Sequence, residues 1–232
     1  MRIGTAGWAI PRHVADSFPG EGSTLQRYAA KFACAEINSS FYRPHRPTTY
    51  ERWAAATPAD FRFAAKIPKA ITHDRRLVDA ADLIQPFLGS VAGLGEKLGP
   101  LLIQLPPSLA FSSETSAFLH AWREQASGQT VIEPRHPSWF EGDVDRLLID
   151  LQIARAAADP AVVPAAAVPG GWRGLTYLRL HGSPQTYASS YGPERLTPVA
   201  ELIRDQSEPW CIFDNTRLGA AAADALSLVD MV

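Results

Sequence analysis

Ionisable side chains occupy alternate positions near the ends of several short apolar segments. One segment carries Glu133 and Arg135, another carries Arg179 and His181, and a third ends at Asp214. Side chains two residues apart on a β-strand point to the same face, so each pair shares a face if these segments are strands. Carboxylates beside arginines and a histidine can bind an anion and move protons near neutral pH. The sequence therefore predicts a charged pocket built from strand ends.

Seven residues have types suited to catalysis in such a pocket. Glu36 and Glu133 are the candidate acid–base pair, and each lies near a cation that keeps it ionised. The cations would hold an anionic substrate and stabilise negative charge that develops in the reaction. A Schiff base at a desolvated Lys66 is an alternative, although no feature specific for carbonyl chemistry accompanies it. The candidate catalytic residues are Glu36, Lys66, Glu133, Arg135, Arg179, His181 and Asp214.

Further polar and aromatic side chains lie at the same segment ends or in the loops that follow. A basic rim with aromatic rings suits nucleotides or single strands, because bases stack on rings and phosphates pair with arginine. Packing beneath the loops is the competing interpretation of the aromatic members. The candidate substrate-binding residues are Trp8, Asn38, Tyr42, His73, Gln104, His136, Trp139, Tyr187, Tyr191 and Asn215.

Eight short apolar or β-rich segments recur along the chain, and most are followed by helical periodicity. Alternating strands and helices imply parallel strands with helices packed outside. Eight such units imply an α/β fold closed into a (β/α)8 barrel of the TIM type, with an open doubly wound sheet as the main alternative. The expected strands are 2–5, 32–38, 61–66, 101–105, 130–135, 153–159, 175–181 and 211–215.

The sixth unit differs from the others. Residues 153–158 are alanine-rich and also compatible with a helix, and the segment 160–174 contains three prolines and Gly170-Gly171. We therefore expect the helix after the sixth strand to be reduced or missing. The whole chain, residues 1–232, is expected to form one barrel domain. The expected helices are 24–31, 48–56, 79–98, 113–126, 144–151, 193–205 and 218–229.

The charged set falls on the strand faces that point into the barrel, toward the carboxyl ends of the strands. Catalytic groups of β/α barrels lie at those ends. An isolated buried charge costs several kcal/mol, so these groups must neutralise one another or bind a ligand. The two interpretations are a ligand pocket and a structural ion-pair layer in which Glu36 and Lys66 bridge neighbouring strands.

Composition narrows the classes of partner and cofactor. The net charge of −2 gives no global attraction to nucleic acid or an anionic membrane. Cys34 and Cys211 lie in apolar segments without metal-ligand spacing and are expected to be buried thiols. No glycine-rich phosphate loop and no HExxH motif occur, so we expect no cofactor and no metal. Without a signal peptide or an apolar segment of membrane-spanning length, the expected location is the cytoplasm and no membrane partner is expected.

Short motifs that occur in order along nearly the whole chain carry a family resemblance. They are IGTAGW at 3–8, EINSSFY at 36–42, FRFAAK at 61–66, ITH at 71–73, LGP at 98–100, QLPP at 104–107, EPRHPSWF at 133–140, YLRLHG at 177–182 and FDNT at 213–216. On these motifs the sequence resembles the barrel family known as domain of unknown function 72, or the YecE-like family. The resemblance implies a β/α barrel and supplies no reaction. The chain departs from the family pattern at Asp214 and Asp224, where asparagine is usual, and between Trp8 and Phe18, where an aromatic residue is expected.

Three functions are compatible with these features. The leading hypothesis is an enzyme that acts on an anionic, phosphate-bearing small molecule or nucleotide by acid–base and electrostatic catalysis. The second is a non-catalytic protein that binds a nucleotide or single-stranded nucleic acid, although the acidic balance of the chain disfavours nucleic acid as a partner. The third is a metal-dependent phosphodiesterase whose metal would be held by Glu36, Glu133, Asp214 and a histidine.

Overall fold

The computed structural model describes residues 1–206 and 208–232, and the strands in this part of the chain belong to one sheet with the order β7-β9-β10-β1-β2-β3-β4-β5-β6-β8. Neighbours are parallel except for β6 and β8, which are antiparallel. The strands are β1 (Arg2–Ala6), β2 (Cys34–Ile37), β3 (Arg62–Lys66), β4 (Leu98–Gln104), β5 (Thr130–Glu133), β6 (Ile153–Arg155), β7 (Ala157–Asp159), β8 (Gly170–Gly171), β9 (Tyr177–Leu180) and β10 (Trp210–Phe213).

The sixth expected strand joins the two sides of the sheet. Its first half, β6, pairs with β5, and its second half, β7, pairs with β9. Only Ala156 separates the two halves, and its backbone N–H donates to the carbonyl oxygen of Ile132 on β5. One short segment therefore brings both sides of the sheet together into a nearly closed barrel. The predicted TIM-type α/β barrel is confirmed, including the alanine-rich strand.

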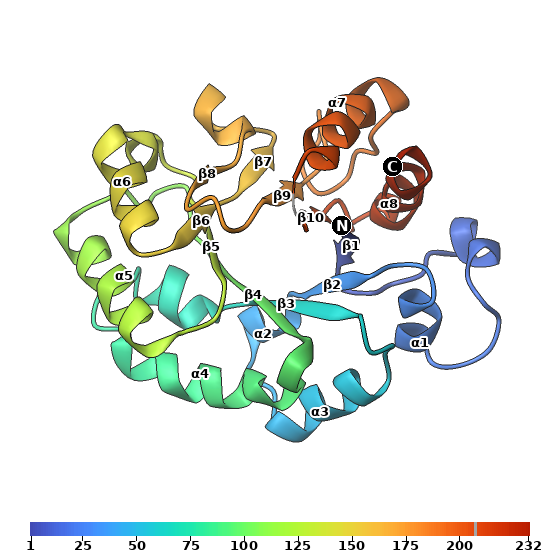
Figure 1. Ribbon diagram of the computed structural model, residues 1–232, viewed down its shortest axis with the longest axis horizontal. Helices are drawn as coiled ribbons and strands as arrows, with labels where there is room; N and C mark the ends of the chain where they lie inside the picture. Colours follow the sequence, from blue (N-terminus) through green and yellow to red (C-terminus); the bar gives the residue numbers. More distant parts are fainter. Residues whose placement is uncertain (207) are drawn as a thin grey trace.

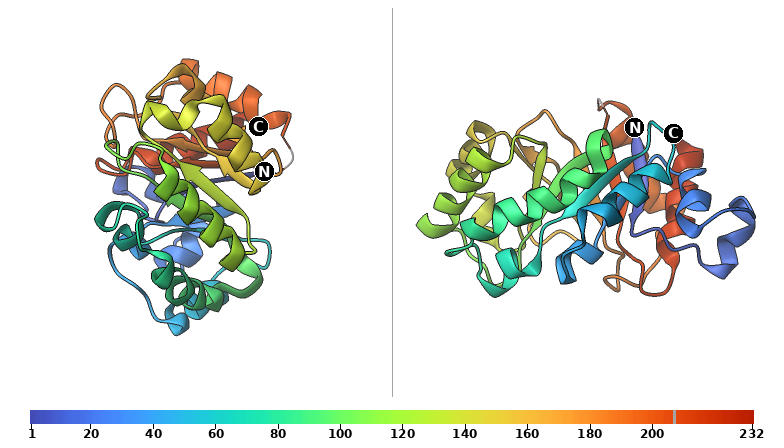
Figure 2. Two further views of the ribbon diagram at one scale, coloured as in Figure 1. Left: turned by 90° about the vertical axis from the view of Figure 1, so that its left-hand side faces the viewer. Right: turned by 90° about the horizontal axis from the view of Figure 1, so that it is seen from below.

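Helices surround the strands on the outside (Figures 1 and 2). Ser23 and Ser112 cap the helices that follow them through their hydroxyl oxygens, which accept from the backbone N–H three residues later. No helix in the described ranges is long and apolar enough to cross a bilayer. The helices are α1 (Thr24–Ala29), α2 (Ser39–Tyr42), α3 (Pro47–Ala55), α4 (Ile84–Val91), α5 (Ser113–Gln125), α6 (Gly142–Asp150), α7 (Pro193–Arg204) and α8 (Ala220–Met231).

The helix expected over residues 79–98 is in fact shorter and broken. A 3-10 turn at Ala81–Leu83 precedes α4, and a second 3-10 segment, Ala92–Lys97, follows it. Gly95 has φ 55° and ψ −134°, a conformation outside the helical region that ends the regular pattern. Strand β4 then begins at Leu98, three residues earlier than the apolar pattern indicated.

The helix after the sixth strand is absent, as its prolines and glycines predicted. A 3-10 turn at Pro164–Ala167 replaces it, and β8 returns antiparallel to β6. Arg155 on β6 holds this segment by donating from Nη1 to the carbonyl oxygen of Ala165 at 2.8 Å. Asp145 on α6 accepts from the backbone N–H of Gly171 at 2.8 Å. Residues 160–171 therefore contribute a loop with a short 3-10 turn to the outer layer of the barrel in place of an α-helix.

Two sets of side chains form the core. Outward-facing residues of the strands, such as Phe63, Ile103 and Ile132, belong to the large apolar cluster between the sheet and the helices. A smaller cluster fills the barrel interior and includes Cys34, Leu102, Val131, Tyr177 and Ile212. Polar inward positions follow this apolar layer along the strands, as the alternation of residue types predicted. The apolar layer thus forms the floor beneath the charged side chains of these strands. They are called the charged cluster below and include Glu36, Lys66, Glu133, Arg179, His181 and Asp214.

The first and last strands are neighbours in the barrel. Arg2 on β1 is in register with Trp210 on β10, and Thr5 with Phe213. Helix α8 packs against both β1 and β10. The two chain ends consequently lie close together at the same end of the barrel (Figures 1 and 2).

Candidate functional site

Arg179, on β9, lies at the centre of the charged cluster and is 0% exposed. Its Nε and Nη2 donate to the two carboxylate oxygens of Glu36 at 3.0 and 2.6 Å. Nη1 donates to Glu133 Oε2 at 2.5 Å, and Nη2 also donates to Asp214 Oδ2 at 3.0 Å. One guanidinium thus joins carboxylates from β2, β5 and the end of β10. Burial acts to lower the pKa of Arg179, but the three carboxylates raise it well above its ordinary value.

His181 lies above Arg179 with a carboxylate at each ring nitrogen. Nδ1 is 3.1 Å from Asp214 Oδ2, and Nε2 is 3.1 Å from Glu133 Oε1. Burial acts to lower the pKa of His181, but the charge of Glu133 and the hydrogen bonds to both carboxylates raise it above 6.5. The shift favours the imidazolium form, which suits a proton donor.

The ionised carboxylates in this network are weak bases. Burial acts to raise the pKa of Glu133, but Arg179, His181 and Arg135 together hold it well below its ordinary value. Asp214 behaves in the same way, with Arg179 and His181 lowering its pKa against the effect of burial. These two side chains therefore orient and stabilise the cations around them near neutral pH.

Lys66, at the end of β3, is the buried cation that differs from the others. It is 7% exposed, and in the described part of the chain no carboxylate oxygen lies within 4.0 Å of Nζ. Nζ instead lies 4.2 Å from the centroid of the Phe41 ring. Burial, followed by the charge of Arg179, lowers the pKa of Lys66 to about 8. The Glu36–Lys66 bridge of the alternative ion-pair-layer interpretation is wrong, because Glu36 pairs with Arg179.

Arg135 and Tyr187 form the rim above His181. Arg135 donates from Nε to Glu133 Oε1 at 2.7 Å and from Nη1 to the Tyr187 hydroxyl at 2.9 Å. Tyr187 has φ +67°, a left-handed conformation that costs on the order of 1–3 kcal/mol in a non-glycine residue. Its ring contacts the His181 ring edge to face at 5.5 Å between centroids. The loop therefore holds a strained residue directly over the charged cluster.

Three of the predicted substrate-binding residues approach the cluster from the end of β4 and from the segments that follow β2 and β3. Gln104, at the end of β4, donates to Glu133 Oε1 at 3.3 Å, and Asn38 donates to Asp214 Oδ1 at 3.3 Å. Asn38 Oδ1 is buried with no hydrogen-bond partner among the described residues. His73 contacts the Phe41 ring at 4.9 Å, and burial, followed by the charges of Lys66 and Arg135, lowers its pKa.

Six predicted substrate-binding residues lie outside the cluster. Trp8 packs on Trp53, and Trp139 donates from its ring nitrogen to the carbonyl oxygen of Leu109. His136 caps the turn at Pro137–Phe140, and Tyr191 and Asn215 anchor the loop after β9. Tyr42 lies at the surface. These contacts shape the loops around the cluster. Of these six residues, Tyr42 is the one with a largely exposed ring.

Two members of the cluster were absent from the predicted set. The Tyr177 hydroxyl donates to Glu36 Oε2 at 2.8 Å, and the Phe41 ring covers Lys66. Tyr177 had a sequence signal, because it lies two residues before Arg179 on the same strand face. Phe41, on α2, had no such signal, since a ring that covers a lysine and a ring that packs against the core look alike in sequence.

A pocket of about 190 Å³ opens beside the cluster on the β5, β7 and β9 side. Its charged lining residues are Glu133, Arg135 and His181, and most of the remaining lining is proline, alanine and valine. Among the described residues there is no group of three His, Cys, Asp or Glu side chains placed to hold a metal ion.

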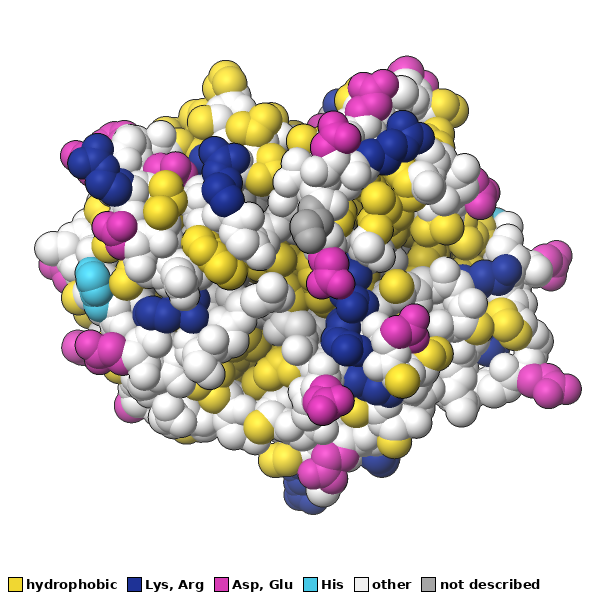
Figure 3. Space-filling model, in the orientation of Figure 1, with side chains coloured by type: hydrophobic (Ala, Val, Ile, Leu, Met, Phe, Trp, Pro, Cys, Tyr) yellow, Lys and Arg dark blue, Asp and Glu magenta, His cyan; other side chains and the backbone are white. Residues whose placement is uncertain are grey.

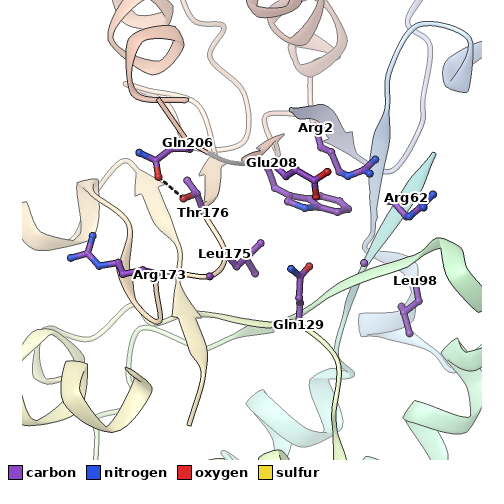
Figure 4. A pocket seen from close by; sticks show the side chains of 12 residues that line it. Arg2, Arg62, Leu98, Gln129, Arg173, Leu175, Thr176, Gln206 and Glu208 are labelled. Carbon is purple, nitrogen blue, oxygen red and sulfur yellow. Dashed lines mark hydrogen bonds between the residues drawn. The ribbon is translucent and has the colours of Figure 1, made fainter. Parts of the chain in front are cut away.

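A larger cavity of about 380 Å³ lies at the opposite end of the barrel (Figure 4). Arg2 and Arg62 line it and donate to backbone carbonyls of Asp60 and Ala59 at 2.9 and 2.8 Å. Figure 3 views this end of the molecule, with Lys and Arg side chains gathered near its centre. Because catalytic groups of β/α barrels lie at the carboxyl ends of the strands, we place the candidate site in the Arg179 cluster.

Together, the fold and the cluster define a TIM-type barrel protein with a buried ion-pair network at the carboxyl ends of its strands. The chain belongs to the family described as "Protein of unknown function DUF72", which matches residues 2–232. It is similar to the UPF0759 protein YecE of Escherichia coli K12, with 31% identity over 149 residues that cover 63% of this chain and 53% of YecE.

Two solved structures of DUF72 family proteins have the same fold. One, from Enterococcus faecalis V583, has a TM-score of 0.83 at 22% identity, and the match covers 99% of this chain and 94% of the Enterococcus chain. The other, from Thermotoga maritima MSB8, has a TM-score of 0.80 at 24% identity, and the match covers 99% of this chain and 98% of the Thermotoga chain. At these identities the likeness confirms the barrel and says nothing of a shared reaction.

Proposed function

We propose that this protein is an enzyme that binds a small anionic, phosphate-bearing molecule at the Arg179 cluster and converts it. The observation that carries this proposal is Lys66, a buried cation without a carboxylate within 4.0 Å in the described chain. Arg179 engages all three carboxylates of the cluster through hydrogen bonds and ion pairs. A lysine that gains no such pair would gain one from an anionic ligand.

The charges of the cluster support an anion as the missing component. Three carboxylates face four cations when His181 is protonated: the carboxylates are Glu36, Glu133 and Asp214, and the cations are Lys66, Arg135, Arg179 and His181. The cluster therefore has a formal excess of one positive charge. A bound anion would reduce that excess and favour protonated Lys66, which makes binding and protonation cooperative.

The proposed roles follow from exposure and pKa. Arg135, whose side chain is 22% exposed, and Lys66, which has no carboxylate within 4.0 Å in the described chain, hold the anion, because Arg179 is already paired with three carboxylates. His181 donates a proton to the leaving alcohol oxygen, since its pKa is raised and it lines the pocket. A water molecule attacks the phosphorus as the P–O ester bond breaks, and the imidazole takes up the proton that this water releases. Glu133 and Asp214 keep the imidazole oriented. Negative charge that develops in the reaction is stabilised by the fixed cations.

The test is a thermal-denaturation series with inorganic phosphate and phenyl phosphate. A ligand at 100 times its Kd stabilises the folded state by about 2.7 kcal/mol, which gives a clear rise in Tm. Lys66→Met and Arg135→Gln should lose this rise. Lys69→Met is the matched control, because Lys69 forms an exposed ion pair with Asp74. No rise with the wild type, or an equal rise in Lys66→Met, would overturn the proposal.

A binding protein without turnover is the second candidate. It is favoured by the low pKa of Glu133 and Asp214, which leaves these carboxylates poor general bases near neutral pH. His181→Gln separates the two candidates. An enzyme should lose hydrolysis of the bound phosphate ester while phosphate still raises Tm, whereas a binding protein shows no turnover in either form.

A further inference from the structure

The pocket beside the cluster combines a charged floor with apolar walls. Arg135 and His181 line it on the side of the cluster, and Pro107 lines it from the chain after β4. The opposite wall comes from Pro160, Val162 and Ala166, in the segment that replaces the helix after the sixth strand. The missing helix therefore leaves a concave apolar surface next to Arg135, His181 and their carboxylate partner Glu133.

The shape of this pocket limits what it can accept. An anionic group placed at Arg135 has the apolar walls immediately beside it. A cavity of about 150 Å³ lined by apolar side chains can hold a benzene ring, so the observed cavity of about 190 Å³ has room for one compact ring-sized group. The walls are formed largely by proline, alanine and valine side chains, which offer no hydrogen bonds to the hydroxyl groups of a sugar.

We propose that this pocket is a specificity subsite for an apolar group attached to the anion. The preferred substrates are then phosphate monoesters of small aromatic or aliphatic alcohols, not sugar phosphates. This inference rests on the proposed function, because the anion must bind at Lys66 and Arg135. Burial of two or more methylene-sized groups should tighten binding roughly ten-fold or more over the bare anion.

The experiment compares phenyl phosphate with inorganic phosphate by calorimetric titration at one pH. Phenyl phosphate should bind at least roughly ten-fold more tightly to the wild type. Val162→Trp should abolish that advantage while inorganic phosphate binds as before, because Val162 is 48% exposed and lines the pocket. Val168→Trp is the matched control, since Val168 is 51% exposed in the same segment and does not line the pocket.

Each outcome has one meaning. If neither compound binds, the proposed function fails and this inference fails with it. If both bind equally to the wild type, the anion site stands and the apolar subsite is overturned. An advantage for phenyl phosphate that persists in Val162→Trp would also overturn the subsite. Thr186→Trp, which fills the pocket from the loop after β9, repeats the test should Val162→Trp fold poorly.

Discussion

At the scale of single residues, two cations of the cluster have opposite roles. Arg179 is bound to three carboxylates and holds three strands together, whereas Lys66 lies beside the same carboxylates without an ion pair in the described chain. Substitution of a cation that stabilises the fold should lower the free energy of unfolding, and substitution of one that destabilises the fold should raise it.

Replacing Arg179 should destabilise the protein severely. In Arg179→Met, Glu36 loses its bidentate partner and Glu133 and Asp214 lose an ion pair each, all while buried. Removing one partner from a buried pair costs about 3–5 kcal/mol, and urea denaturation should show a loss of at least that size. Arg146→Met is the control, because its ion pair with Asp143 is exposed and should contribute less than about 1 kcal/mol.

Replacing Lys66 should stabilise the ligand-free protein. The folded pKa is lowered from 10.5 to about 8, so the charged form is disfavoured and Lys66→Met should gain on the order of 1–3 kcal/mol at pH 7. The unfolded chain binds more protons between pH 8 and 10.5, so the wild type recovers stability as the pH rises through that window. Denaturation at pH 7 and pH 10 measures this, and a loss of stability at pH 7 would show that Lys66 is structural.

At the scale of elements, the segment from 153 to 171 closes the barrel and forms the wall of the pocket. Alternation, prolines and glycines were enough to predict eight strands and the missing helix. The antiparallel return of β8 could not be predicted, because it depends on side-chain contacts of Arg155 and Asp145 with backbone atoms 10 and 26 residues further along the chain. The three-part structure of residues 81–97 was also missed: α4 ends at Val91, and Gly95, with φ 55°, lies within the 3-10 segment that follows it.

The residue types and their alternation predicted which residues belong to the candidate site better than they predicted which of them form pairs. Strand parity places Glu133, Arg179 and Lys66 inside the barrel, and all three are there. Parity does not determine which carboxylate meets which cation, because that depends on the stagger between strands and on side-chain reach. Arg179 was therefore expected to face a substrate, although it is enclosed by carboxylates.

Gly171→Ala should weaken this element. Gly171 has φ +60°, and an added Cβ would lie 2.6 Å from the carbonyl oxygen of Ile153. We expect a loss of more than about 1 kcal/mol in denaturation and faster hydrogen exchange in residues 160–171. Gly128→Ala is the control, because nothing lies within 4 Å of its added Cβ and its φ is not in the left-handed range. Equal effects at the two glycines would contradict the close approach of β8 to β6.

At the scale of the whole molecule, the charged network sets the pH dependence of stability. The pKa of His181 is raised above 6.5, so its contribution is complete below pH 6.5 and is lost as the pH rises through the folded value. The pKa values of Glu133 and Asp214 are lowered, so their contributions are present above the ordinary carboxyl range and are lost as the pH falls through the folded values. These three groups favour greatest stability on the acid side of neutrality, and Lys66 restores stability only as the pH rises above about 8.

A comparison of two pH profiles tests this behaviour. His181→Gln should remove the part of the decline in stability above pH 6.5 that the wild type owes to His181, because glutamine does not titrate. Chemical denaturation from pH 4 to pH 9 measures both curves. Parallel curves above pH 6.5 would mean that His181 has the same proton affinity in the folded and unfolded states.

The pairing of β1 with β10 has a consequence for how the chain is made. Their registered residues, such as Arg2 and Trp210, are separated by most of the sequence. During synthesis at about 5–20 residues per second, one edge of the first strand therefore waits roughly 10–40 s for its partner to emerge from the ribosome. An open strand edge is a template for association with other chains. The nascent barrel thus has its greatest exposure to aggregation and to chaperones before its final strand is complete.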